Sequence, residues 1–329
     1  MSAPRKNRMI FMAAAGFLLA AFGVSLCVGR YPLTLSDIAA ALSGGEGMAA
    51  QVFYRLRLPR SLAAMAAGMA MGLSGAVYQM VFANPLAAPD IMGVSGGATL
   101  GAAVAIVLLG GSFVCTGAFV GGMAALVLSL LLTRASGSRG TASIVLSGIL
   151  LSALAKTGIM LLKLMADSEG ELAAIEFFTM GSFAAVTAGT LPSLLSGIGL
   201  GMLVLLALGR QLMLLTLSDE EAASLGVPVF AVRTAVLCAA TLMACAVSAH
   251  AGVIAFSALI APHTARLLLS GRVKGLAMLS VLCGGVLMLL SDICARLLPG
   301  AELPTSVFTT VLGAAMIVSL MVKGGRSDG

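Results

Sequence analysis

The stretch Leu200-Gly201-Met202-Leu203-Val204-Leu205-Leu206-Ala207-Leu208 decides the fold class, because it carries no polar side chain on either face. A strand of a membrane β-barrel alternates apolar and polar residues, and this stretch does not alternate. Over the whole chain, 60% of the 329 residues are hydrophobic and 10% are charged, which is too little polar surface to cover a soluble domain. The sequence therefore predicts an all-α, polytopic membrane protein.

About ten apolar stretches approach the roughly 20 residues that a helix needs to cross the hydrocarbon core. These predicted spans cover residues 9–28, 58–80, 91–109, 113–133, 142–165, 191–208, 233–250, 252–269, 275–295 and 304–322. No soluble domain interrupts them, so residues 1–329 are expected to form one membrane domain. Two halves of five spans each would have opposite orientations, an arrangement that fits an inverted repeat.

The basic residues between the predicted spans indicate the orientation of the chain. With the N-terminus inside, twelve are inside: Arg5, Lys6, Arg8, Arg134, Arg139, Arg210, Arg233, Arg266, Arg272, Lys274, Lys323 and Arg326. Five are then outside: Arg30, Arg55, Arg57, Arg60 and Arg296. Because inside loops are enriched in Lys and Arg, this difference predicts that both termini are cytoplasmic.

One inside connection has the features of a short, capped helix. Ser218 and Glu221 have the spacing of a capping box, and Asp219 and Glu220 follow in the first turn, where the helix dipole favours anions. Gly226 suits the C-terminal cap. Two turns are too short to persist alone in water, and Ala222, Ala223 and Leu225 provide a small apolar face. The segment is therefore either a solvated connector or a docking element for a partner protein.

Arginines on the predicted outer side oppose the positive-inside rule. Arg55, Arg57 and Arg60 precede the second span, and Arg296 ends the ninth. They either anchor the helices to lipid phosphates or form a cationic rim for an acidic partner, since guanidinium binds carboxylate with two hydrogen bonds. Asp292 lies four residues before Arg296 and is expected to pair with it.

Several small residues and two lysines stand out inside the predicted spans. Glycines four residues apart, which allow helix backbones to approach closely, occur at Gly68/Gly72, Gly93/Gly97/Gly101, Gly117/Gly121 and Gly197/Gly201. Lys156 and Lys163 are seven residues apart in the fifth span and hence on one face. Lys156 is interpreted as facing a path or an interface, and Lys163 either shares that face or extends to the nearer membrane surface.

The polar residues and motifs of the sequence argue against a bound metal, a cofactor or a catalytic site. The six cysteines form no C-x-x-C pair, and the two histidines, His250 and His263, lie apart with no carboxylate spacing that suits a metal. The chain has no G-x-x-x-x-G-K-[ST] loop that binds ATP phosphates and no H-E-x-x-H motif. We therefore predict no metal, no cofactor and no catalytic residues.

Motifs spread along the chain in a fixed order resemble those of one family. The first half carries Arg57-Leu58-Pro59-Arg60, Gly68, Gly75, Gln79, Asn84-Pro85-Leu86-Ala87-Ala88-Pro89, Gly93, Ser95, Gly97 and Ala98. The second half carries Asp219 through Gly226, Gly252-Val253-Ile254-Ala255-Phe256, Pro262-His263, Arg266, Gly271, Asp292, Arg296, Glu302-Leu303-Pro304 and Gly313. In this series the chain resembles the FecCD-type permeases of ABC importers for ferric siderophores, haem and cobalamin.

The resemblance implies ten helices per subunit and a second permease subunit, identical or different, around one central path. It implies two cytoplasmic ATP-binding subunits and a binding protein outside the membrane. The segment of about 211–232, with Ser218, Asp219, Glu220, Glu221, Ala222, Leu225 and Gly226, would couple the permease to the ATPase. Arg57, Arg60 and Arg296 would dock the binding protein, and Gly75, Gln79, Asn84, Pro85, Gly93, Gly97, Pro262 and His263 would belong to the structural motif or the path.

The function expected from this resemblance is uptake of a ferric siderophore across the bacterial plasma membrane. Haem, cobalamin or a small oxyanion are alternative cargoes. The different class of an ion-coupled secondary transporter would need carboxylates in mid-membrane, and only Asp292 approaches that position, near the end of a span. An ATPase gene and a binding-protein gene beside this one would favour the importer.

Overall fold

The structure, a computed structural model, describes residues 3–136, 141–167, 170–269, 275–298 and 302–324. Five residues named above therefore lie outside the described residues: Arg139, Gly271, Arg272, Lys274 and Arg326. The side chains of Arg5, Lys6 and Lys323 lie outside them too.

Helices make up all the regular structure of the described residues, which confirms the all-α prediction. The longer helices are α1 (Ala3–Cys27), α4 (Leu58–Val81), α5 (Val94–Leu108), α6 (Val114–Ala135), α7 (Thr141–Met165), α9 (Leu191–Ala207), α12 (Val229–Ala251), α13 (Ser257–Leu268), α14 (Leu276–Leu297) and α15 (Thr305–Gly324). The shorter elements are α2 (Leu35–Leu42), α3 (Met48–Val52), η1 (Phe53–Arg57), η2 (Pro89–Met92), α8 (Glu171–Met180), α10 (Gly209–Leu214) and α11 (Asp219–Ser224).

Each of the ten predicted spans contains one helix, but the helices differ in length. Within the described residues, six apolar helices are long enough to cross a membrane, and three further apolar helices have 10–17 residues. The prediction of a full span at 252–269 differs from the structure, because α13 has only 12 residues, or about 18 Å. Gly252 has a φ of +70° and cannot continue α12, and the Val253 N–H bonds to the Phe178 carbonyl, 3.1 Å away.

The second predicted span extends further than expected, because α3, η1 and α4 form one continuous helical stretch, Met48–Val81. The turn η1 is wider than an α-helix and lies directly before Pro59. Proline has no N–H to donate, so the regular hydrogen-bond pattern is interrupted at this point. Arg57 is the last residue of η1, and Arg60 lies in the first turn of α4.

Glycines bring two pairs of helices into backbone contact. A Cβ at Gly68 of α4 would overlap the carbonyl oxygen of Gly284 of α14, and a Cβ at Gly284 would overlap the carbonyl oxygen of Gly68. In the same way, a Cβ at either Gly101 of α5 or Gly117 of α6 would overlap the carbonyl oxygen of the other. The predicted role of the four-residue glycine spacing is thereby confirmed for these helices, since packing replaces the hydrophobic drive that lipid does not supply.

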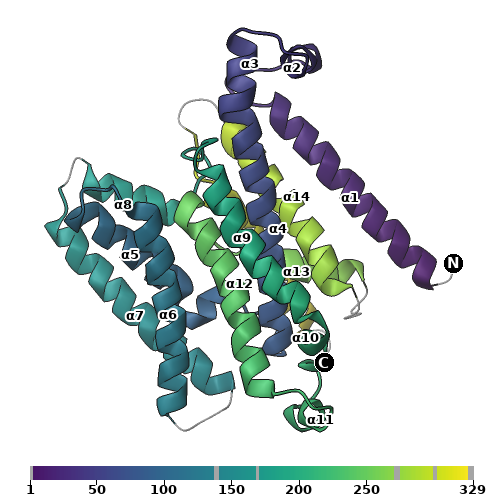
Figure 1. Cartoon of the computed structure of the whole chain (residues 1–329), viewed down its shortest axis with the longest axis vertical. Coiled ribbons are helices and arrows are strands. Elements are labelled where there is room, and N and C mark those ends of the chain that lie inside the picture. Colours follow the sequence, from purple (N-terminus) through teal and green to yellow (C-terminus); the bar gives the residue numbers. More distant parts are fainter. Residues whose placement is uncertain (1–2, 137–140, 168–169, 270–274, 299–301, 325–329) are drawn as a thin grey trace.

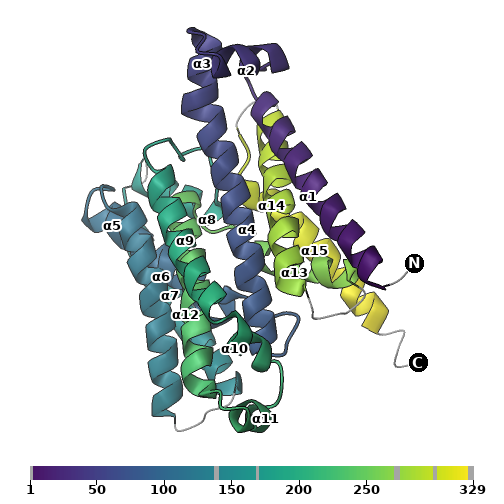
Figure 2. The same ribbon diagram turned by 45° about the vertical axis from the view of Figure 1, so that its right-hand side comes forward.

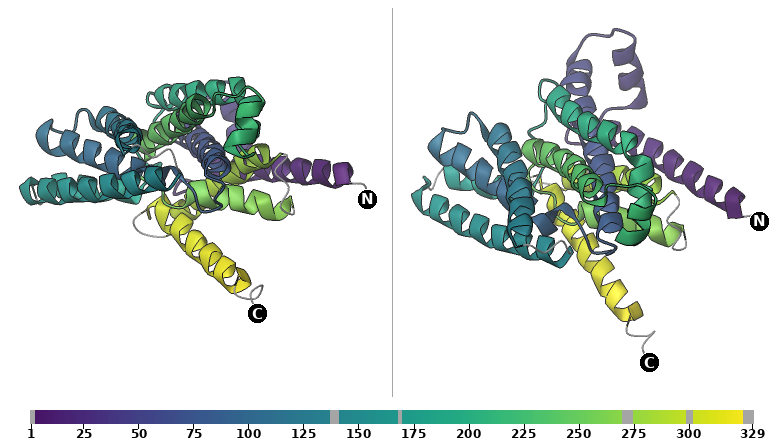
Figure 3. Two further views of the ribbon diagram at one scale, coloured as in Figure 1. Left: turned by 90° about the horizontal axis from the view of Figure 1, so that it is seen from below. Right: turned by 60° about the horizontal axis from the view of Figure 1, so that its bottom comes forward.

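The helices form an elongated bundle with two distinct ends. The elements α2 and α3 project at one end and α11 projects at the other (Figure 1), and the turned view in Figure 2 shows the same arrangement. We call these the α2–α3 end and the α11 end. The helix α4 is buried along most of its length, whereas α7 is largely exposed. Seen from below, α7 lies at one edge of the bundle and α15 projects away from it (Figure 3).

Candidate functional site

The helix α11 is held by the capping box that the sequence predicts. The Ser218 hydroxyl accepts a hydrogen bond from the Glu221 N–H over 3.3 Å, and the Glu221 carboxylate accepts one from the Ser218 N–H over 3.1 Å. The bonds from the Ser218 N–H and hydroxyl lower the pKa of Glu221, because they favour the charged carboxylate. At the other end Gly226 has a φ of +80°, as expected of a C-terminal glycine.

A salt bridge, which the sequence did not reveal, fixes α11 to the start of α12. The two guanidinium nitrogens of Arg233 donate to the two oxygens of Asp219, over 2.6 and 3.2 Å. Such a two-point contact fixes orientation as well as distance. Ala222 is the buried contact of α11, with 1% of its surface exposed.

The rest of α11 is free to meet another molecule. Glu220, Glu221 and Ala223 are exposed, and Leu225 has 60% of its surface exposed. Leu217 and Phe230 are exposed on either side of the segment, at 43% and 44%. An acidic tip surrounded by apolar side chains, on a rigidly attached helix, is a surface suited to a protein partner.

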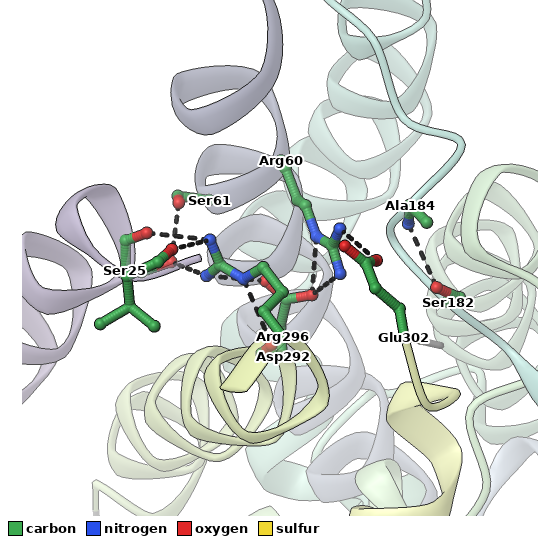
Figure 4. Close-up of polar contacts among 9 residues, drawn as sticks. Ser25, Arg60, Ser61, Ser182, Ala184, Asp292, Arg296 and Glu302 are labelled. Carbon is green, nitrogen blue, oxygen red and sulfur yellow. Dashed lines mark hydrogen bonds and ion pairs between the residues drawn. The ribbon is translucent and has the colours of Figure 1, made fainter. Parts of the chain in front are cut away.

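A second charged cluster lies at the α2–α3 end and joins four segments of the chain (Figure 4). Arg60 binds Asp292 at 2.9 Å and Glu302 at 2.8 Å. Arg296 binds the other oxygen of Asp292 at 3.0 Å, which confirms the pair expected from their four-residue spacing. Asp292 is fully buried, and its charge is compensated by both guanidinium groups.

The same cluster attaches the end of α1 to the bundle. Arg296 donates to the carbonyl oxygens of Ser25 and Val28, each at 3.0 Å, and to the Ser25 hydroxyl at 2.6 Å. The Ser25 hydroxyl is also 2.7 Å from that of Ser61 on α4. Arg296 therefore connects α1 and α14 directly, and α4 through the serine pair.

The burial of these arginines differs from the exposed rim suggested by their positions in the sequence. Only 8% of Arg57, 8% of Arg60 and 3% of Arg296 is exposed in the isolated chain. The reason is that Asp292 and Glu302 hold Arg60 and Arg296 inward. Arg57 has no carboxylate partner among the described residues and donates to the Tyr31 carbonyl at 3.2 Å. A docking role for the three residues stays a prediction.

The connection between α4 and α5 forms the turn that Asn84 and Pro85 predict. The Asn84 side-chain oxygen accepts a hydrogen bond from the Leu86 N–H at 2.9 Å, and the Asn84 carbonyl accepts one from the Ala87 N–H at 3.1 Å. Gly93, with a φ of +76°, ends η2 and starts α5. Gly97, further along α5, faces α6, because a Cβ there would press on the Gly121 carbonyl.

The remaining predicted motif residues meet where α4 crosses α13. A Cβ at Gly75 would overlap the Ala258 carbonyl, so α13 lies directly against this side of α4. Gln79 is 2% exposed, and its side-chain oxygen accepts a hydrogen bond from Arg266 at 3.0 Å. Pro262 and His263 are buried within α13. These residues form a packed helix crossing.

The described residues contain no group of three or more His, Cys, Asp or Glu side chains placed to hold a metal ion. The capped helix at one end and the buried charge cluster at the other are therefore the two candidate sites of the bundle. A helical bundle with several apolar helices long enough to cross a membrane is the architecture of a multi-pass membrane protein.

Comparisons with known proteins identify the family. The profile of the FecCD transport family matches residues 17–323. The chain is 35% identical to the molybdate import system permease MolB of Haemophilus influenzae, covering 93% of this chain and 94% of MolB. It is 34% identical to the ferric enterobactin permease FepG of Escherichia coli, and the match covers 97% of this chain and 99% of FepG. It is 35% identical to the vitamin B12 permease BtuC of Vibrio cholerae, covering 95% of each.

A solved structure shares the fold as well. It is described as an inward-facing ABC transporter of the metal-chelate type and has 33% sequence identity and a TM-score of 0.86, covering 96% of this chain and 99% of that one. The chain belongs to the FecCD transport family. It is a multi-pass permease subunit of a metal-chelate-type ABC importer and is not itself an enzyme.

Proposed function

We propose that the chain transports a ferric siderophore across the bacterial plasma membrane, with energy supplied by two ATP-binding subunits that dock on α11. A second permease subunit, identical or different, would complete the path, and an extracytoplasmic binding protein would deliver the cargo at the α2–α3 end. The permease would convert ATP-driven movement of the docked subunits into a change between inward-facing and outward-facing states.

The single observation that carries this proposal is the construction of α11. A two-turn helix is too short to persist alone in water, so its stability depends on contacts with the rest of the protein. Here the capping box closes its first turn, and the Asp219–Arg233 salt bridge joins that turn to the 23-residue helix α12. Movement imposed on α11 is therefore transmitted to α12, which packs against α4, α6 and α9.

The direction of the bundle in the membrane is supported by its charges. If the α11 end is cytoplasmic, α1 and α15 both place their termini on that side, and twelve basic residues between spans lie inside against five outside. The cytoplasmic position of both termini satisfies the positive-inside rule. ATP-binding subunits in the cytoplasm can then reach α11.

The arginine cluster supports docking of an acidic partner at the opposite end. The cluster contains three positive charges, on Arg57, Arg60 and Arg296. It contains two negative charges, on Asp292 and Glu302, so its net charge is +1. Glu302 is the more accessible carboxylate, with 31% of its side chain exposed. A carboxylate of the binding protein would replace Glu302 on Arg60 or bind Arg57, and such pairs fix orientation more than affinity.

The cargo is proposed from the relatives that resemble the chain. FepG, the permease named for ferric enterobactin, matches over 97% of this chain, which supports a ferric siderophore. MolB, named for molybdate, has 35% identity and makes an oxyanion the second candidate. Cobalamin and haem are the further alternatives, and BtuC, named for vitamin B12, supports the first of them.

Charge reversal on α11 tests the proposed coupling. The double substitution Glu220→Lys and Glu221→Lys is expected to reduce co-purification of the ATP-binding subunits at least tenfold. Glu46→Lys, which alters an exposed acidic residue in the loop between α2 and α3, is the matched control and is expected to change nothing in this assay. Retention of the ATP-binding subunits by the double variant would refute the coupling role of α11.

Uptake by the reconstituted complex tests the cargo. With wild-type permease, ATP-binding subunits and binding protein in vesicles, we expect ATP-dependent accumulation of a labelled ferric siderophore. Accumulation of labelled molybdate instead would replace the first candidate cargo by the second.

A further inference from the structure

We propose that Lys156 of α7 faces the water-filled path of the transporter and makes that path selective for anionic cargo. The inference rests on the proposed transport function and deepens it by naming the charge of what is carried. It follows from the position of one lysine along α7, from the face on which it lies, and from the absence of a carboxylate partner in the described structure.

The depth of Lys156 in its helix is the first observation. α7 is one of the helices long enough to cross the membrane, with its spanning part at Ala142–Met165. At 1.5 Å per residue, Lys156 lies about 21 Å from the first of these residues and about 13 Å from the last. A lysine side chain is roughly half as long as the shorter distance, so it does not reach the membrane surface.

The cost of this position is the second observation. A lysine within a membrane helix is costly when it faces lipid, so such residues almost always face the bundle interior or water. Lys156 is exposed and forms no ion pair among the described residues. Lys163, its neighbour two turns away, differs, because it binds Glu176 of α8 at 2.6 Å.

The two flanks of α7 have different chemistry. Its buried side, with Ala155 and Leu162, packs on α5. One flank, about 100° away, carries Leu150, Leu154 and Leu161, which are 50–59% exposed, and we call it the leucine flank. The opposite flank, the lysine flank, carries Lys156 and Lys163 beside Ile149 and Met160, which are 59% and 67% exposed. Only the lysine flank places charged side chains within the span, where lipid does not suit them.

The lysine flank points to the interior side of the transporter. The Lys163–Glu176 salt bridge shows that this flank faces α8, and α8 also contacts α15. In the view from below, α15 projects away from the bundle (Figure 3). The other elements that pack on α7 are α5, α6 and η2. An unpaired cation in a water-filled cleft with walls of low dielectric constant attracts anions and repels cations.

The experiment tests the position of Lys156 and its effect on cargo separately. The complete complex, reconstituted in vesicles, is treated with a sulfonated, membrane-impermeant amine-acylating reagent, and peptide mass spectrometry measures the modification of each lysine. Leu154→Lys is the matched control, because it places an amine at nearly the same depth on the leucine flank. We expect position 156 to be modified at least tenfold faster than the amine at position 154.

The charge is tested by uptake of two ferric siderophores, one whose iron complex carries a net negative charge and one whose complex carries none. Lys156→Glu is expected to lower uptake of the anionic complex at least tenfold relative to uptake of the neutral one, whereas Lys156→Arg is expected to leave this ratio unchanged. Failure of the reagent to modify Lys156 would overturn its position in the path, and an unchanged probe ratio would overturn the selectivity. Loss of ATP-dependent uptake of every cargo by the wild-type complex would instead refute the proposed function, since modification of Lys156 needs no transport.

Discussion

Replacing Asp292 by asparagine should destabilise the bundle more than any other single change in the arginine cluster. Asp292 is fully buried and binds Arg60 at 2.9 Å and Arg296 at 3.0 Å. The substitution Asp292→Asn keeps the volume but leaves two buried guanidinium groups without their shared carboxylate. Removing one partner from a buried ion pair costs about 3–5 kcal/mol, because the charge that is left has no compensation.

The contacts that remain set the size of the effect. Arg60 would keep Glu302, and Arg296 would keep the Ser25 and Val28 carbonyls. Glu302→Gln is the matched control, because Glu302 is partly exposed and serves only Arg60, which would still hold Asp292. For this variant we expect a loss of about 1 kcal/mol or less.

Thermal unfolding in detergent, followed with a thiol-reactive fluorophore, measures the difference. The chain has no tryptophan, but Cys245 is fully buried and becomes reactive when the bundle opens. We expect Tm to fall by at least about 6 °C for Asp292→Asn and by no more than about 3 °C for Glu302→Gln. If the two variants melt at the same temperature, Asp292 is not the centre of the cluster.

Three further predictions concern packing and α11. Gly68→Ala should lower Tm by several degrees, because its methyl group would overlap the Gly284 carbonyl, whereas Gly199→Ala, with open space around it, should not. Equal melting of the two would contradict the close contact of α4 and α14. Ser218→Ala should destabilise α11 by about 0.5–2 kcal/mol, because it removes the N-cap hydroxyl. We expect faster proteolysis near residue 218, and an unchanged rate of proteolysis would count against the cap. The pKa of Glu221 is lowered in the folded state, so its stabilisation is present above the ordinary carboxyl pKa and disappears as the pH falls through the folded value. Hydrogen-exchange protection of the Ser218 amide, which donates to the Glu221 carboxylate, should therefore drop on acidification, and constant protection would speak against the capping box.

Features that depend on local sequence could be predicted. Apolar runs fix the helical class, and the four-residue spacing of Asp292 and Arg296 indicates their pairing. The caps of α11 follow from Ser218, Glu221 and Gly226, since each acts within a few residues. Glycine spacing likewise predicts which helix faces approach closely.

Features that depend on distant residues could not be predicted. The burial of Arg60 depends on Glu302, which is 242 residues away in the chain. The shortness of α13 depends on the hydrogen bond between Val253 and Phe178, in another part of the bundle. Attachment of α11 depends on Arg233, which the sequence marks only as one of several inside basic residues.

Transport in vesicles tests the central claim most directly. The permease is reconstituted with and without its ATP-binding subunits, and uptake of the labelled ferric siderophore and of molybdate is followed after ATP is added on the α11 side. We expect accumulation only when the ATP-binding subunits are present, and none with the Glu220→Lys, Glu221→Lys variant. Accumulation by the permease alone, without a subunit that hydrolyses ATP, would contradict the proposed ATP-driven import.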